Sequence, residues 1–130
     1  MAQIKGILGN DGGAPARILN FIAAAAISAG EGLRIDAAGK AALATDNNLP
    51  LAGVALTDAS AGFQCSMVTG SGLVLYMICA AAVNRGDNLM TDEAAAGGLI
   101  IWSVADDDVV VAYALEDAPA AGGLTKVLVV

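Results

Sequence analysis

The feature that most constrains this chain of 130 residues is a phrase that its second half repeats. Residues 27–33 read ISAGEGL and residues 83–89 read VNRGDNL, so an apolar residue, two spacers, a glycine, an acid and a leucine recur in order. A second phrase, ALTDA at 55–59, returns as ALEDA at 114–118. Self-similarity of this kind is typical of a duplicated supersecondary unit. The sequence therefore predicts an internal two-fold repeat, with halves at about 27–70 and 83–130.

Within each half, short β segments are bounded by turn residues. Residues 33–36 alternate in character, 37–40 form a turn and 41–44 return, which is the pattern of a β-hairpin. The run Leu99 to Trp102 is apolar on both faces, which predicts a strand buried on both sides, by opposing strands or by a neighbouring subunit. Further apolar or β-branched runs between Asn, Gly or Asp turns predict strands at 51–56, 64–68, 73–79, 99–104, 109–115 and 125–130.

These patterns predict an all-β chain with at most a short helix, folded as a compact β-barrel or β-tulip-like domain with an internal two-fold strand-and-turn repeat. A mass of 12.8 kDa is enough for one domain with its own core, expected at 17–130. Residues 1–16 are expected to be an N-terminal arm or a first strand. The alanine-rich stretch 14–27 favours one helical turn by composition, but Phe21, Ile22 and Ile27 fit a strand equally well.

Charge and cysteine usage exclude several classes of function. The net charge is −7 and the pI is about 4.1, the wrong sign for binding nucleic acid or an anionic membrane surface. The apolar run that follows Arg17 and ends at Ala29 imitates a secretory signal, but its basic region is weak and cleavage there would cut the first repeat. Cys65 and Cys79 lie in apolar surroundings, which predicts buried free thiols rather than a disulfide and mildly favours a cytosolic history.

No residue set in the sequence supports an enzyme or a metal site. The chain contains no histidine, so the usual general base and the usual nitrogen ligand for zinc are both missing. The acidic triplet Asp106, Asp107 and Asp108 could bind calcium, but consecutive carboxylates on a turn point in different directions, which favours a solvated hairpin tip. We therefore predict no catalytic residue, no cofactor and no metal. Other carboxylate candidates, at Asp46, Asp58, Asp92, Glu93, Glu116 and Asp117, lack the aromatic residues that usually wall a sugar cleft.

One function that this composition allows is that of a non-viral binding or carrier module. Lipoyl and biotinyl carriers are small acidic β domains with an internal repeat, and they display a lysine on a tight hairpin. Lys40, on the expected turn at 37–40, is the one lysine in such a place, and its neighbours lack the expected acid or methionine.

The phrases at 28–33 and 51–62, with their second-half versions at 85–89 and 112–118, resemble those of the small capsid decoration, or cement, proteins of tailed bacteriophages. The resemblance covers about 27–130. It implies a non-enzymatic β-rich protein that binds the outer surface of the phage head and stabilises it by bridging neighbouring coat subunits. The implied partners are the major capsid protein and further copies of the chain, with a homotrimer favoured, and the implied location is the capsid exterior after assembly in the host cytoplasm.

The surplus of apolar residues, 57% of the chain, fits contacts between chains of this kind. The resemblance also implies that an N-terminal arm can order on the capsid by adding a strand to a coat-protein sheet. The segment 2–8 alternates well enough to do this. The candidate capsid-contact residues are therefore Ala2, Gln3, Ile4, Lys5, Gly6, Ile7 and Leu8.

Overall fold

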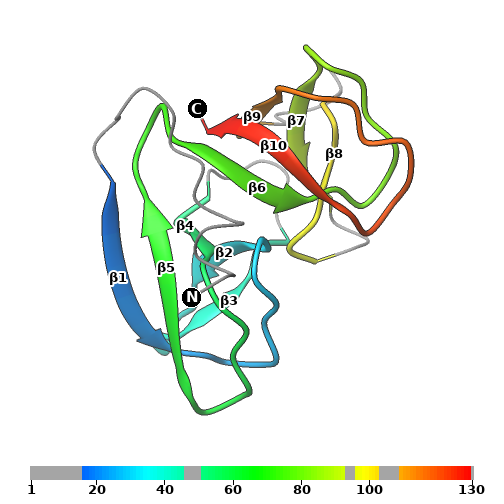
Figure 1. The fold of residues 1–130 in the computed structure, drawn as a ribbon. Helices are drawn as coiled ribbons and strands as arrows, with labels where there is room; N and C mark the ends of the chain where they lie inside the picture. The colour runs from blue at the N-terminus through cyan, green and yellow to red at the C-terminus, as the bar shows by residue number, and fades with distance from the viewer. Residues whose placement is uncertain (1–15, 46–50, 93–95, 103–108, 130) are drawn as a thin grey trace.

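The computed structural model describes residues 16–45, 51–92, 96–102 and 109–129, and within them the chain forms β-strands and no helix (Figure 1). The all-β prediction is confirmed. The strands are β1 (Arg17–Ile22), β2 (Gly32–Ile35), β3 (Ala41–Leu43), β4 (Gly53–Ala55), β5 (Gln64–Thr69), β6 (Val74–Ile78), β7 (Asn88–Thr91), β8 (Leu99–Ile101), β9 (Ala112–Ala114) and β10 (Leu124–Val129).

The strands are arranged in two five-stranded sheets with the same topology. The first has the order β1-β5-β4-β2-β3 and the second β6-β10-β9-β7-β8, and the neighbouring strands in both are antiparallel. The two orders coincide when β6 is matched to β1, β7 to β2, and so on to β10 and β5. Figure 1 shows the sheets side by side, the first in blue to green and the second in green to red. The predicted internal repeat is therefore confirmed in the topology.

Backbone hydrogen bonds outside the strands repeat as well, and they fix which residues correspond. The Ala23 amide donates to the Phe63 carbonyl, and the Cys79 amide donates to the Gly123 carbonyl. Ile27 forms a bridge with Ala59, as Val83 does with Ala118. Because these contacts place β1 and β6 inside the repeat, each structural half begins one strand before the boundary expected from the sequence phrases.

Two hydrophobic clusters form the core. One lies within the first half and consists of Ala23, Ile27, Leu33, Ala41, Ala55, Cys65 and Met67. The other is formed mainly by the second half, but it also contains Val54, Leu56 and Val68 of the first. Since neighbouring residues of a strand point to opposite faces, β4 and β5 contribute one face to each cluster. The first sheet is thus a shared layer between the two halves.

Backbone hydrogen bonds also join the sheets directly. The Gly32 amide donates to the Gly97 carbonyl at 2.8 Å, and the Gly97 amide donates to the Ala44 carbonyl at 2.9 Å. Nearby, the Ile78 amide donates to the Gly30 carbonyl at 2.9 Å. Gly97 has a φ of +82°, which glycine adopts without the steric cost that a side chain brings. The β7–β8 turn is therefore held against the start of β2.

Three details of the sequence predictions can be compared with the structure. The two sheets are not closed in the described residues, so the barrel is not confirmed. The alanine-rich stretch contributes strand β1 and no helical turn over its described part, because Ile18 to Ile22 pair with β5. Within a single chain, the predicted burial of Leu99 to Trp102 on both faces is not found. Strand β8 lies at the margin of its sheet, with Leu99 buried and Ile101 exposed.

Candidate interaction surface

The described part of the chain holds no group of three or more His, Cys, Asp or Glu side chains that could bind a metal ion. Asp106, Asp107 and Asp108 lie outside the described residues, as do the arm candidates at 2–8. Lys40 lies exposed at the end of the β2–β3 turn, where the Lys40 amide donates to Asp36 Oδ1 at 2.9 Å. In the residues that the structure describes, no helix is long and apolar enough to cross a membrane.

Four carboxylates that could be read as candidate acids hold turns instead. Asp58 Oδ1 accepts a hydrogen bond from the Ala29 amide at 2.8 Å, and Asp117 Oδ1 accepts one from the Arg85 amide at 2.7 Å. Glu31 and Asp87 in turn accept from the amides of Ser28 and Asn84. These pairs occupy equivalent places in the two halves. All four acids belong to the repeated sequence phrases, which is a signal of their role that the sequence carries. Their role in holding the turns was nevertheless not predicted.

Cys65 and Cys79 are free and buried, so the prediction for the two thiols is confirmed. Burial raises the pKa of the Cys65 thiol above its usual range. Burial also raises the pKa of the Cys79 thiol, and a hydrogen bond with Thr125 opposes that rise. A buried thiol with a raised pKa is a poor nucleophile, because the thiolate is the reactive form.

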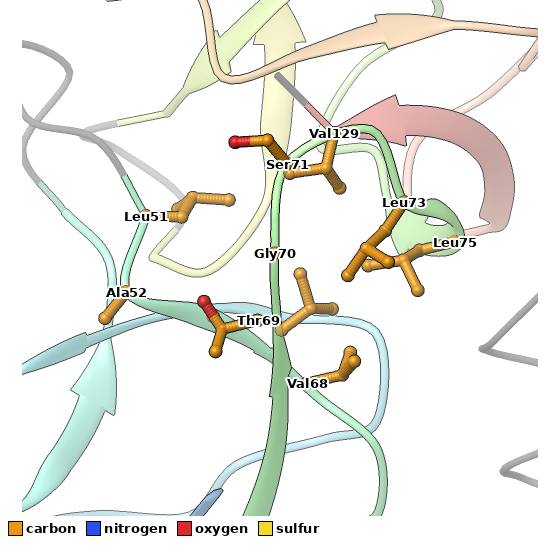
Figure 2. A pocket seen from close by; sticks show the side chains of 11 residues that line it. Leu51, Ala52, Val68, Thr69, Gly70, Ser71, Leu73, Leu75 and Val129 are labelled. Atoms are coloured by element: carbon orange, nitrogen blue, oxygen red, sulfur yellow. The ribbon is translucent and has the colours of Figure 1, made fainter. Parts of the chain in front are cut away.

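A small cavity lies between the two halves (Figure 2). It is bounded by Val54 and Val68 of the first sheet and by Leu73, Leu75 and Val129 of the second half. Its volume is about 150 Å³. Sites for small molecules usually measure roughly 300–1,000 Å³. The cavity is therefore an imperfection in the packing of one half on the other, too small for a typical ligand site.

The chemically distinctive feature of the described surface is its exposed apolar side chains. Phe63, in the β4–β5 connection, has 69% of its surface exposed. Large exposed apolar side chains on a small domain mark contacts with other molecules when they gather on one face. The exposed large hydrophobic residues are Ile18, Ile22, Ile35, Phe63, Ile101, Tyr113, Leu115 and Leu124. Such side chains can contribute apolar contacts to a partner protein.

Comparison with known proteins identifies the fold and its relatives. A family model described as phage cement protein matches residues 14–130. Among solved structures, the N base of the head fiber gp8.5 of bacteriophage phi29 matches with a TM-score of 0.69 at 20% sequence identity. That match covers 89% of this chain and 95% of the phi29 chain. No curated protein matches. At this identity the structural likeness establishes the fold, and the family model covers all of the described residues.

Proposed function

This chain belongs to the phage cement protein family, and from that premise we propose that it binds the outer surface of a phage head and stabilises it by bridging neighbouring coat subunits. Members of the family are structural proteins of the virion, so the chain is a capsid-associated structural protein and not an enzyme. The observation that carries the proposal is the family match over residues 14–130. It favours the cement role over the carrier module that Lys40 left open.

The described surface supports such a role. Exposed side chains such as Ile18, Phe63 and Tyr113 provide apolar area for protein contacts. Paired strands, capped turns and a junction of backbone hydrogen bonds make a rigid body, so little conformational entropy is lost on binding. A rigid body that contacts two coat subunits at once opposes their separation.

We propose the major capsid protein and further copies of this chain as the partners, with a trimer favoured. Each copy in an oligomer can contact a different coat subunit, and attachment at several points is far tighter than each contact alone. This lets modest individual contacts hold a shell together.

We also propose that the segment 2–8 contacts the capsid by adding a strand to a coat-protein sheet. Strand addition depends on main-chain amides, and proline has none. The variant Ile4→Pro/Ile7→Pro should therefore weaken capsid binding, whichever side of the strand faces the coat protein. The variant Ile4→Val/Ile7→Val keeps both amides and should bind like the original. Equal binding by the two variants would contradict the arm assignment without affecting the rest of the proposal.

The proposal is tested with empty capsids of the same phage, assembled without this protein. The purified chain should sediment with the capsids, saturate at a fixed number of copies per shell, and raise the temperature at which the shells open. A chain with native circular dichroism that stays in the supernatant would overturn the binding role. Saturable binding with no change in the opening temperature would overturn the stabilising role.

A further inference from the structure

The contact between the two halves covers one particular face of the first sheet. Val54, Leu56 and Val68 form what we call the first-half patch, and each has only 1% of its surface exposed. Val54 and Val68 are paired across β4 and β5, and Leu56 follows β4. The three belong to the hydrophobic cluster of the second half. The first-half patch is therefore buried by the second half of the same chain.

The same patch exists on the second sheet, and there it is open. Tyr113 pairs with Leu128 across β9 and β10, as Val54 pairs with Val68 across β4 and β5. The Leu115 amide donates to the Lys126 carbonyl, as the Leu56 amide donates to the Ser66 carbonyl. Leu115 therefore corresponds to Leu56.

We call Tyr113, Leu115 and Leu128 the second-half patch. Tyr113 is 40% exposed, Leu115 is 38% exposed and Leu128 is half-buried. Like its buried counterpart, the patch consists of large side chains, but each of them is partly open to solvent.

The residues that cover the first-half patch also have counterparts. Leu75 is buried and faces Val68 across the small cavity, as Figure 2 shows. Val54 lines the same cavity. Met77 lies close by, because a Cβ placed on Gly32, the partner of Val54 in β2, would lie 3.5 Å from Met77 Cε.

The matching hydrogen bonds of Ala23 and Cys79 set the register between β1 and β6. In that register Leu75 corresponds to Leu19 and Met77 to Phe21. We call Leu19 and Phe21 the β1 patch, and both side chains are only half-buried, whereas Leu75 and Met77 are fully buried. Leu19 and Phe21 also pack on the core cluster of their own half, so only part of the covering surface of the first half is open.

The margins of the two sheets limit the extent of these patches. Ile18 in β1 is 55% exposed, and its counterpart Val74 in β6 is 7% exposed. At this position the side chain of the first half, and not that of the second, is the more exposed. The second-half patch is therefore confined to β9, the residue after it, and the part of β10 paired with it.

We propose that copies of this chain associate head to tail, with the second-half patch of one copy packed on the β1 patch of the next, in the manner that the two halves pack within one chain. The inference deepens the homo-oligomer part of the proposed function, on which it rests, and does not require a capsid. The contact joins two different surfaces, so each copy keeps one free surface until the assembly closes. A closed trimer would then carry first and second halves alternately around one ring.

The binding partner of the second-half patch is taken to be a second copy of the chain, because the chain itself shows which surface covers a patch of this kind. The first-half patch is buried by a homologous half, and the two open surfaces are the matching members of the same contact. A head-to-tail arrangement buries both at once.

Cross-linking of single-cysteine variants tests the pairing of surfaces. Tyr113→Cys and Leu19→Cys are made separately in a Cys65→Ala/Cys79→Ala background and treated with a short bismaleimide. A mixture of the two should give a cross-linked dimer, while neither variant alone should link to itself. A dimer from either variant alone would show a self-complementary contact and overturn the proposal, as would the lack of any dimer in the mixture.

The oligomeric state provides a second readout. Tyr113→Glu/Leu115→Glu should raise the dissociation constant of the oligomer at least about tenfold in sedimentation equilibrium, because association would bury carboxylates in an apolar contact. Lys40→Glu makes the same change in net charge at an exposed turn outside both patches and should leave the constant unchanged. An original chain that is monomeric, or an oligomer insensitive to the double substitution, would overturn the inference. Capsid sedimentation of the same samples reports on the proposed function separately, since a monomer that binds capsids leaves that function standing.

Discussion

Asp58 and Asp117 show how single side chains hold this fold together. Each carboxylate accepts a hydrogen bond from the amide of a residue far away in the sequence, Ala29 or Arg85, just before a glycine with positive φ. Asp58→Ala should lower the free energy of unfolding by about 1 kcal/mol, because the turn amide loses its partner. Asp58→Asn keeps a carbonyl acceptor and should lose less, as measured by urea denaturation. Equal losses for the two variants would show that the hydrogen bond contributes nothing.

Gly97 and Gly39 occupy the same place in the two repeats but meet different surroundings. Both have positive φ, and a Cβ on Gly39 would meet open space, whereas a Cβ on Gly97 would lie 2.9 Å from Glu31 Oε2 and 3.1 Å from Leu43 Cδ2. Gly39→Ala should cost only backbone strain, about 1 kcal/mol. Gly97→Ala should cost about 1–3 kcal/mol more in denaturant unfolding, because it also pushes the junction apart. The two variants would lose stability equally if the β7–β8 turn did not pack on the first half.

The buried thiols make stability depend on pH at the alkaline end. Burial raises the pKa of Cys65 and of Cys79 above the ordinary value of 9.0, so the folded chain keeps protons that the unfolded chain releases. The free energy of unfolding should therefore be unaffected by these thiols below about pH 9 and should fall as the pH rises above that value. Cys65→Ala/Cys79→Ala should show a shallower fall between about pH 8.5 and 10.5. Parallel profiles for the two proteins would contradict the assignment.

At the scale of elements, β4 and β5 form the layer that couples the two halves. Val68→Ala should lower the free energy of unfolding by about 2 kcal/mol, because it removes buried methyl groups from the cluster of the second half. Trp102, the only tryptophan, lies in the second half, so its fluorescence should report the same shift in midpoint as far-UV circular dichroism. Ile18→Ala is the control, since Ile18 pairs with Val68 but is exposed. A Trp102 transition that Val68→Ala does not move would show that the halves unfold independently.

The positions of most strands could be predicted from the sequence, although β1 was left open between a strand and a helical turn, but the burial of the strands could not. The hairpin of β2 and β3, the closing strands β5 and β10 and the repeat itself follow from alternation, turn residues and internal similarity, which are local signals. The burial of Leu99 to Trp102 could not be predicted, because an apolar run does not indicate whether its strand lies at the margin of a sheet. Val54 and Tyr113 occupy the same repeat position, yet one is buried and the other exposed. That difference arises from the packing of one half on the other, which no local pattern encodes.

Only the type of the candidate surface could be predicted from the sequence, and not the residues that form it. Composition and the missing histidine correctly pointed away from an active site, and the family resemblance pointed to the capsid. The two open patches could not be found in the sequence, because they stand out only when equivalent residues of the two halves are compared for burial. Leu19 and Leu75 are the same residue type at the same repeat position and differ only in their surroundings.

At the scale of the whole molecule, the chain is a duplicated rigid unit whose first half is covered by its second. The second-half patch and the β1 patch are the two surfaces that correspond to this contact, and they lie on different halves. One copy can therefore bind the next through them. In the closed assembly that we propose, each copy would bring its own coat contacts to a common body.

Attachment to the outside of the phage head across neighbouring coat subunits can be tested by cryo-electron microscopy of empty capsids saturated with the purified chain. We expect additional density on the outer surface of the shell, into which the two-sheet body fits, at positions that touch more than one coat subunit. Density on the inner surface, density confined to single coat subunits, or shells that remain bare at saturating concentration would contradict it.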